Sequence, residues 1–202
     1  MQLFYTPVTG SDKQAEHRTA HALLRAVLRQ AYGLEDAVLA QDEHGKPFLP
    51  RHPEIAFNLS HCAGLAVCGV AGEPSGVDAE QIRPLRERVL RRVFAPEEVA
   101  AVGESASPDE MFFRFWTLKE SFVKAIGIGI SYPMQEVRFQ LTPAGIRSSQ
   151  PDWQFGQYLL QGQWVISCCV PKGEASAGCT GGGSAIKNSP SSVRTRGFVV
   201  YV

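Results

Sequence analysis

The segment SPDEMFFRFWTLKESFVKAIG, residues 107–127, predicts a long helix with both ends marked in the sequence. Ser107 suits the N-cap and Pro108 the first helical position, and Glu110 completes a capping box. Gly127 marks the C-terminal end. One apolar stripe at helical spacing forms the expected core face: Met111, Phe115, Leu118, Phe122 and Ile126.

The opposite side of this helix is not a plain polar face. It carries Phe113 and Trp116 beside Glu120 and Lys124. One interpretation is a surface pair of Glu120 and Lys124, worth only about a few tenths of a kcal/mol, with the aromatic rings packed beneath a loop. The other is a binding surface, to which Lys119, at the boundary between the two faces, could add its ammonium group.

A second motif, GVDAE at residues 76–80, follows a turn and places Asp78 and Glu80 two residues apart. If the segment is extended, both side chains leave the same face about 7 Å apart. Carboxylates this close repel each other in a dry site unless a cation lies between them, and oxygen ligands of this kind suit Mg²⁺. An isolated motif of this kind can also be an ordinary polar strand face.

Residues 55–61, IAFNLSH, predict a strand that leads through a turn into a return strand from Leu65 to Val70. Ser60 and His61 then lie near the turn, where a hydroxyl and an imidazole could donate to phosphate oxygens. The alternative is a turn-capping serine beside an ordinary exposed histidine.

Near the N-terminus, a helix is expected from a cap at Ser11 or Asp12 to Gly33. A row of guanidinium groups on its polar side can fork around phosphate oxygens or form a solvated face. This row consists of Arg18, Arg25 and Arg29. Further along, Lys46 and Pro47 by themselves indicate a turn that carries a cation.

Together these segments resemble the 4'-phosphopantetheinyl transferases of the surfactin-synthetase-activating (Sfp) type. The resemblance extends from Arg18 to roughly Val170, and its motifs occur in order: HRTAHALLR, GKPFLP, FNLSH, GVDAE and FWTLKESFVKAIGIGISYP. In that family the enzyme transfers the phosphopantetheine arm of coenzyme A to a serine of an acyl or peptidyl carrier protein. It releases adenosine 3',5'-bisphosphate and requires Mg²⁺.

The resemblance implies roles for individual residues of this chain. Glu120, directly or through a metal-bound water, would take the proton from the carrier serine, while Lys124 would hold the diphosphate and Lys119 would support the same region. Trp116 would shape the wall of the site. The implied metal ligands are Asp78, Glu80 and Glu120. The implied coenzyme A contacts are Arg18 and His61 at the 3'-phosphate, Ser60 at the diphosphate, and Lys46 with Pro47 at the nucleotide edge.

The N-terminal region departs from the family pattern. Family members usually carry a longer segment with further basic residues before the position of Arg18, which here follows 17 residues. Coenzyme A affinity could therefore be lower in this chain, or Arg25 could substitute for the missing residues.

The resemblance also implies an α+β fold with two similar halves related by a pseudo-twofold axis. Each half would be a small, mostly antiparallel sheet packed with a long helix, with coenzyme A bound between them in a monomer. We expect an N-terminal half over residues 1–75 and a C-terminal half with the metal and catalytic motifs over 76–172. Residues 173–202 form a Gly/Ser-rich, flexible tail in this scheme, and its end, 197–202, could add an edge strand.

The composition is consistent with this interpretation. Twenty basic and twenty acidic residues give zero formal charge, so composition favours neither nucleic acid nor membrane as a partner. There is no apolar stretch long enough to span a bilayer and no signal-peptide pattern, so the cytoplasm is expected. Five cysteines lack metal-site spacing and indicate core residues or free thiols rather than disulfides or a zinc site.

A basic segment lies between the two acidic motifs. Carrier proteins present acidic helices, so this segment could help to dock them, although it could equally be a solvated helix balanced by neighbouring glutamates. Its arginines are Arg83, Arg86, Arg88, Arg91 and Arg92.

Two other functions are compatible with the same residues. One is a coenzyme A or nucleotide-binding protein without transferase activity, and the other is a Mg²⁺-dependent phosphohydrolase that uses water in place of the carrier serine. Intact Asp78, Glu80, Glu120 and Lys124 favour the transferase over a simple binder. Carrier proteins of fatty-acid, polyketide, nonribosomal-peptide and siderophore pathways are all possible partners.

Overall fold

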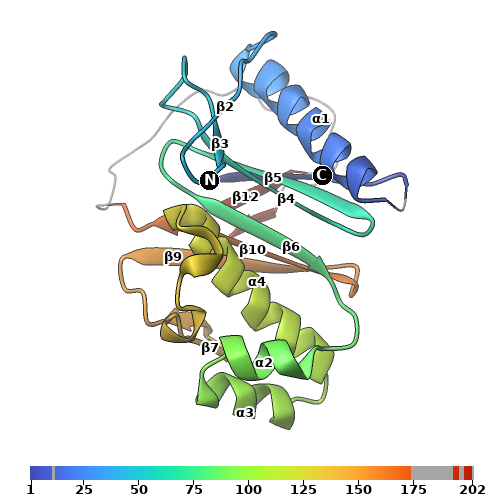
Figure 1. Ribbon diagram of the computed structural model, residues 1–202, viewed down its shortest axis with the longest axis vertical. Coiled ribbons are helices and arrows are strands. Elements are labelled where there is room, and N and C mark those ends of the chain that lie inside the picture. The colour runs from blue at the N-terminus through green and yellow to red at the C-terminus, as the bar shows by residue number, and fades with distance from the viewer. Residues whose placement is uncertain (11, 174–192, 196–197, 202) are drawn as a thin grey trace.

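Two small sheets, each packed against one long helix, form the core of the computed structural model (Figure 1). The structure describes residues 1–10, 12–173, 193–195 and 198–201. From top to bottom of Figure 1 the order of layers is helix α1, the first sheet, the second sheet and helix α4. The predicted α+β class, with a long helix on each small sheet, is confirmed, whereas the pseudo-twofold relation of the halves stays a prediction.

The first sheet has the strand order β11-β12-β1-β5-β4. Its bounds are β1 Gln2–Pro7, β4 Ala56–Cys62, β5 Leu65–Ala71, β11 Val193–Thr195 and β12 Phe198–Tyr201. Strand β5 pairs antiparallel with β1 and β4, as expected from the predicted return strand. The expected C-terminal strand is present as β12, which pairs parallel with β1, but it is not an edge strand, because β11 pairs with its other side. Of the expected flexible tail, residues 174–192, 196–197 and 202 lie outside the described residues.

Helix α1, Lys13–Tyr32, covers the first sheet at strands β4 and β5. Asp12 caps it, because its Oδ1 atom accepts a hydrogen bond from Ala15 N at 2.6 Å. Gly33 ends it in the left-handed conformation, as predicted. Apolar residues of α1 pack onto the sheet: Ala20, Leu24, Val27 and Leu28. A short hairpin, β2 Ala40–Gln41 and β3 Pro47–Phe48, follows.

The second sheet consists of β6 Gly76–Gln81, β10 Trp164–Pro171 and β9 Trp153–Leu160, all antiparallel. Helix α4, Pro108–Ile126, packs on β6 and β10. Its predicted bounds are confirmed, but the predicted capping box is wrong, because the Ser107 side chain makes no cap hydrogen bond.

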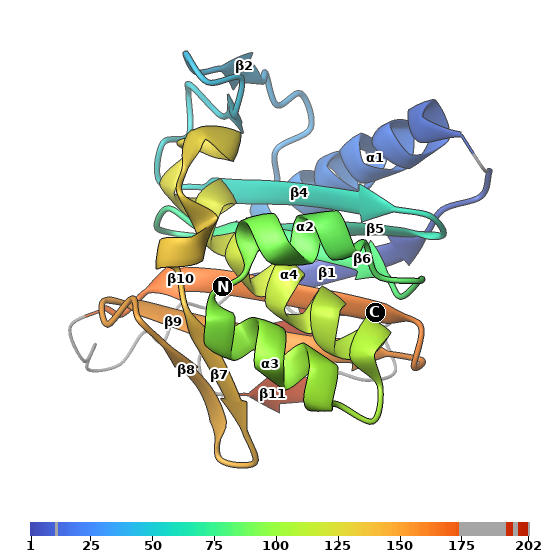
Figure 2. The same cartoon turned by 60° about the horizontal axis from the view of Figure 1, so that its bottom comes forward.

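Helix α4 is buried on most sides rather than along one stripe. Phe115, Leu118 and Phe122 of the expected core face are buried, and so is Phe113 on the opposite side. The reason is visible in Figure 2, where further elements cover the face of α4 that points away from the sheet. These elements are α2 Glu87–Val93, α3 Pro96–Glu104, the 3₁₀ turns η1 Gly129–Ser131 and η2 Met134–Glu136, and the hairpin of β7 Phe139–Thr142 and β8 Gly145–Ser148.

The two sheets meet where β4 lies beside β6. No backbone pairing between these two strands is recorded among the described residues, and side chains of β4 bond to the β6 backbone instead. Val77 N donates to Asn58 Oδ1 at 2.9 Å, and Ala79 N donates to Ser60 Oγ at 3.1 Å. This junction fixes Ser60 beside Asp78.

Buried cysteines lie in each apolar layer: Cys62 and Cys168 between the two sheets, Cys68 on the α1 side and Cys169 on the α4 side. Cys62, Cys68, Cys168 and Cys169 are free thiols, as predicted, and Cys179 lies outside the described residues. Burial raises the pKa of Cys62 to about 12, so this thiol is neutral and packs as a small core residue. Within the described part of the chain, none of the helices combines the length and apolarity needed to cross a membrane.

Candidate functional site

A buried carboxylate, Asp78, lies at the centre of the candidate site, where β6, β4 and α4 meet. Its Oδ1 atom accepts hydrogen bonds from Ser60 Oγ at 3.0 Å and from Lys124 Nζ at 2.7 Å. Its Oδ2 atom is buried and has no hydrogen-bond partner among the described residues. Because an unpartnered buried carboxylate oxygen is costly, this atom is placed to receive a ligand.

Lys124 extends from the last turn of α4 into the same site. Besides Asp78, its ammonium group donates to Ser60 Oγ at 3.1 Å and to Val77 O at 3.2 Å. Ser60, Asp78 and Lys124, three of the predicted site residues, therefore come together from three elements. An incoming anion would have to share the ammonium protons that now bond to Asp78.

Gly76 explains how α4 comes so close to β6. A Cβ atom at this position would overlap the Ser121 carbonyl oxygen and would lie 2.6 Å from Ala125 N. The strand thus begins with a residue whose missing side chain lets the helix backbone lie directly against it. That contact sets the height of Lys124 over Asp78.

Glu120 lies one turn before Lys124 on α4 and shares the electrostatic environment of Asp78. Burial, the charge of Asp78 and the charge of Glu80 raise the pKa of Glu120 to about 7, against the opposing effect of Lys124. A carboxyl group with a pKa near neutrality can accept and release a proton at physiological pH. Glu120 therefore lies within the influence of the Asp78 charge and has a pKa near neutrality, and its role as proton acceptor stays a prediction.

Glu80, the remaining predicted metal ligand, is partly engaged by a neighbour. Its Oε2 atom accepts a hydrogen bond from Arg83 at 2.8 Å, and the Arg83 guanidinium lies 4.8 Å from the centre of the Phe113 ring. Among the described residues, no three His, Cys, Asp or Glu side chains are gathered closely enough to hold a metal ion. The donor types nevertheless fit a hard divalent cation, because the free Asp78 oxygen and the charge-destabilised Glu120 would both gain from one.

Lys119 does not reach this site, contrary to the sequence prediction. It is fully buried on another side of α4, where its Nζ atom pairs with Glu98 Oε2 at 2.8 Å. The same ammonium donates to the carbonyl oxygens of Met134, at 2.9 Å, and Val137. Its three protons are used inside the second half of the molecule, so Lys119 has a structural role.

Replacement of Lys119 by Met should lower the free energy of unfolding by about 3 kcal/mol, because it leaves the buried Glu98 carboxylate without a positively charged partner. Two backbone amides, Ala95 N and Phe139 N, still bond to Glu98, which keeps the loss near the lower end of the range. Chemical denaturation measures the change. The double variant Lys119→Met/Glu98→Gln should recover part of the stability, and equal losses in the single and double variants would contradict the assignment.

Lys46 contacts the backbone of α4 rather than an open surface. Its Nζ atom donates to Lys124 O at 2.7 Å and Ala125 O at 3.2 Å, at the C-terminal end of the helix. Burial lowers the pKa of Lys46, partly offset by Asp42. Lys46 and Pro47 also line a cavity of about 350 Å³ with an apolar wall. The predicted pair therefore borders a pocket, and Lys46 also contacts the backbone carbonyl of Lys124.

His61 and Arg18 lie on the other side of β4 from Asp78. Successive side chains of a strand point to opposite faces, so Ser60 faces β6 while His61 faces α1. His61 Nδ1 lies 3.1 Å from Glu16 Oε2. Arg18 is exposed, and its contact among the described residues is a long hydrogen bond of 3.5 Å to Gln14. His61 thus faces α1 from β4, whereas Arg18 lies on α1 itself, and no contact between the two is present among the described residues.

Sequence reasoning missed Asn58 and Gly76 as site-forming residues. Asn58 is two positions before Ser60 and shares its face of β4, so strand alternation could have identified it. Gly76 carries no comparable signal, because only the position of α4 reveals why a side chain is excluded there.

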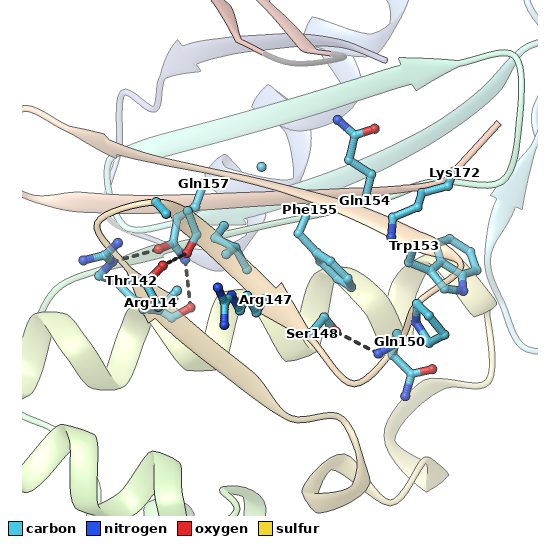
Figure 3. A pocket seen from close by; sticks show the side chains of 16 residues that line it. Arg114, Thr142, Arg147, Ser148, Gln150, Trp153, Gln154, Phe155, Gln157 and Lys172 are labelled. Carbon is cyan, nitrogen blue, oxygen red and sulfur yellow. Dashed lines mark hydrogen bonds between the residues drawn. The ribbon is translucent and has the colours of Figure 1, made fainter. Parts of the chain in front are cut away.

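Two further cavities lie beside helix α4. One, of about 500 Å³, has Glu120 and Trp116 on one wall and Arg88 and Arg92 of α2 on another. A wider one, of about 1,020 Å³, lies between the β7–β8 hairpin and β9 and contains none of the predicted site residues. Figure 3 shows this wider cavity, in which Arg114 is held by Gln157. Of these two cavities, the one that Glu120 lines is the one that borders a predicted site residue.

Comparison with known proteins identifies similar sequences. A family model described as the 4'-phosphopantetheinyl transferase superfamily matches residues 74–169. A 4'-phosphopantetheinyl transferase of Bacillus subtilis is 34% identical over 140 residues, covering 66% of this chain and 62% of that protein. The 4'-phosphopantetheinyl transferase HetI of Nostoc is 37% identical over 173 residues, covering 77% of this chain and 72% of HetI. This chain thus spans 62% of the length of the Bacillus relative.

Among solved structures, the holo-acyl-carrier-protein synthase (AcpS) of Thermotoga maritima aligns with a TM-score of 0.43 at 16% identity, covering 50% of this chain and 64% of that one.

Proposed function

This chain belongs to the 4'-phosphopantetheinyl transferase superfamily, and we propose that it transfers the phosphopantetheine arm of coenzyme A to a serine of an acyl or peptidyl carrier protein. The observation that carries the proposal is the arrangement around Asp78. A buried carboxylate with a free oxygen lies beside a lysine, a serine and a near-neutral glutamate. This set can hold a cation, an anion and a proton acceptor together.

Asp78, Glu80 and Glu120 would hold Mg²⁺. When bound, the ion would polarise the coenzyme A diphosphate and offset charge on the departing bisphosphate. Asp78 would contribute the buried oxygen that has no partner, and Glu80 would have to loosen its contact with Arg83. The three carboxylates come from β6 and α4, so the position of α4 decides whether they can converge.

Glu120 is the proposed general base. The carrier serine oxygen forms a bond to the phosphorus that bears the pantetheine arm, and the bond from that phosphorus to the bridging oxygen breaks. Adenosine 3',5'-bisphosphate leaves with the electron pair, and the serine proton passes to Glu120. A serine hydroxyl is a weak nucleophile until such a base removes its proton.

Coenzyme A would lie across the edge of β4. Lys124 and Ser60 face the diphosphate position on one side of the strand, and on the other side His61 of β4 and Arg18 of α1 would bind the 3'-phosphate. The cavity bordered by Lys46 and Pro47 would take the nucleotide edge. Because both halves of this site come from one chain, we propose that a monomer is active.

The carrier protein would approach through the cavity at Glu120. This cavity has Arg88 and Arg92 on one wall, and Val89, Trp116 and Tyr132 give it apolar surface. An acidic, amphipathic helix that carries the acceptor serine at its end matches both features. The base Glu120 would then face the incoming hydroxyl.

Charge reversal of this wall should weaken carrier recognition without affecting chemistry. For Arg88→Glu/Arg92→Glu we expect KM for the carrier to rise about tenfold at low salt, with kcat and KM for coenzyme A unchanged. Steady-state kinetics with a purified apo carrier measures this. The matched control is Arg147→Glu, an exposed arginine of the β7–β8 hairpin that lies in a different cavity. Equal effects of the two changes would rule out this docking face.

Intact-mass analysis of apo carrier proteins tests the function itself. Each carrier is incubated with the protein, coenzyme A and Mg²⁺, and transfer adds the mass of one phosphopantetheinyl arm to the carrier. Breakdown of coenzyme A without any carrier would instead show a phosphohydrolase. Coenzyme A binding without either reaction would show a binding protein.

A further inference from the structure

Three of the five histidines lie together where α1 meets β4. The rings of His17 and His21, one helical turn apart on α1, have centroids 4.3 Å apart, and the centroid of the His61 ring is 6.0 Å from that of His17. His17 is exposed and His21 is half-buried. This histidine cluster is not used by the proposed chemistry at Asp78.

Glu16 fixes the orientation of one member of the cluster. It is buried and accepts from Lys13 Nζ at 2.9 Å, with His61 Nδ1 at 3.1 Å from the same oxygen. Burial alone would raise the pKa of Glu16, but these two partners outweigh that and hold it below its usual value. An ionised carboxylate only accepts, so the proton of His61 lies on Nδ1, and Nε2 points away from Glu16.

Apart from Glu16, the charged groups around His17 and His21 are positive. Arg25 on α1 and His61 on β4 act electrostatically on His21, and Glu16 is already engaged by Lys13 and His61. Burial, followed by the charges of His17, Arg25 and His61, lowers the pKa of His21. Two imidazoles in ring contact disfavour double protonation unless an anion lies between them and their cationic neighbours. A dianion at this position would offset these positive charges and favour protonation of His21.

We propose that His17 and His21, together with His61, bind a phosphate monoester dianion, and that His21 takes up a proton when it binds. This inference rests on the proposed function, in which the monoester is the 3'-phosphate of coenzyme A. The pair would add a proton-linked component to the phosphate contacts implied for Arg18 and His61. Coenzyme A recognition then weakens as the pH rises above neutrality.

The test compares coenzyme A with 3'-dephospho-coenzyme A by isothermal titration calorimetry between pH 7 and pH 8.5. Over this range a phosphate monoester is already largely dianionic, so its own titration contributes little. We expect the ratio of the two affinities to fall about tenfold per pH unit for each proton taken up on binding. Titrations at pH 7.5 in buffers of different ionisation enthalpy should show the same extra proton uptake for coenzyme A.

Variants of His17 and His21 test whether these two residues cause the pH dependence of the affinity ratio. His17→Gln/His21→Gln should flatten the pH dependence of the ratio, and His21→Lys, which stays charged over the whole range, should keep affinity high at pH 8.5. His52→Gln is the matched control, because His52 lies outside the cluster and contacts Glu54. It should behave as the unmodified protein.

Two outcomes overturn the inference. If coenzyme A binds but the ratio is independent of pH, or keeps its pH dependence in the double variant, the inference fails and the proposed function stands. If neither ligand binds at any pH and no carrier gains mass, the inference and the proposed function fail together.

Discussion

Glu120→Gln should reduce phosphopantetheine transfer by at least about a thousandfold in kcat. The amide cannot accept the serine proton, and a positioned general base contributes about 10²–10⁴-fold. It also removes one of the proposed metal ligands, which adds to the loss. Mass analysis of the carrier over time measures the rate, and Glu104→Gln, an exposed glutamate at the end of α3, is the matched control.

The same substitution should stabilise the metal-free protein. The pKa of Glu120 is about 7 in the folded state, above its unfolded value of 4.5, so folding favours the protonated form. Stability of the unmodified protein therefore falls as the pH rises from about 4.5 to about 7 and stays reduced above that. Gln removes this cost, and we expect a gain of roughly 1–3 kcal/mol at pH 8 and little gain at pH 4.5.

Thermal unfolding at the two pH values, without metal, measures the gain. A variant that is inactive and also less stable at pH 8 would show that the loss of activity comes from damage to the fold. An active variant would remove Glu120 from the mechanism.

Much of the site could be predicted because its residues follow local rules. The two long helices are delimited by Asp12, Gly33 and Gly127, which act through the chain within a few residues. Ser60 and Asp78 lie on strands whose alternation is visible in the sequence. Lys124 is four residues after Glu120, so one helix face presents both.

Lys119 shows where this reasoning fails. A helical wheel places it at the border of the binding face, but it does not show which distant segments cover that border. Glu98 and the carbonyls of Met134 and Val137 come from other elements and enclose the ammonium group. The same covering segments bury Phe113, which the sequence placed opposite the core. Long-range packing, rather than local propensity, decides these positions.

Gly76→Ala should destabilise the protein by at least about 4 kcal/mol, a size that few single substitutions reach. The added methyl group would overlap the Ser121 carbonyl oxygen and approach Ala125 N, and neither backbone atom can move without shifting α4 as a whole. A shift of α4 would also move Lys124 away from Asp78. We expect low yield, a much lower unfolding temperature and loss of transfer in any folded fraction.

Alanine substitutions at two other glycines serve as controls. They show whether the loss at Gly76 comes from overlap with the α4 backbone or from any replacement of glycine by alanine. At Gly69 the methyl group would overlap only the end of the Met1 side chain, which can rotate away, so Gly69→Ala should cost less than about 1 kcal/mol. At Gly103 in α3 nothing lies within 4 Å, and alanine should be neutral or stabilise the helix by about 0.5–1 kcal/mol. If Gly76→Ala unfolds no more easily than these two, the direct contact of β6 with α4 does not set the geometry at Asp78. If Gly76→Ala is the only one of the three variants that is strongly destabilised, the missing side chain at Gly76 is what places Lys124 over the Asp78 carboxylate.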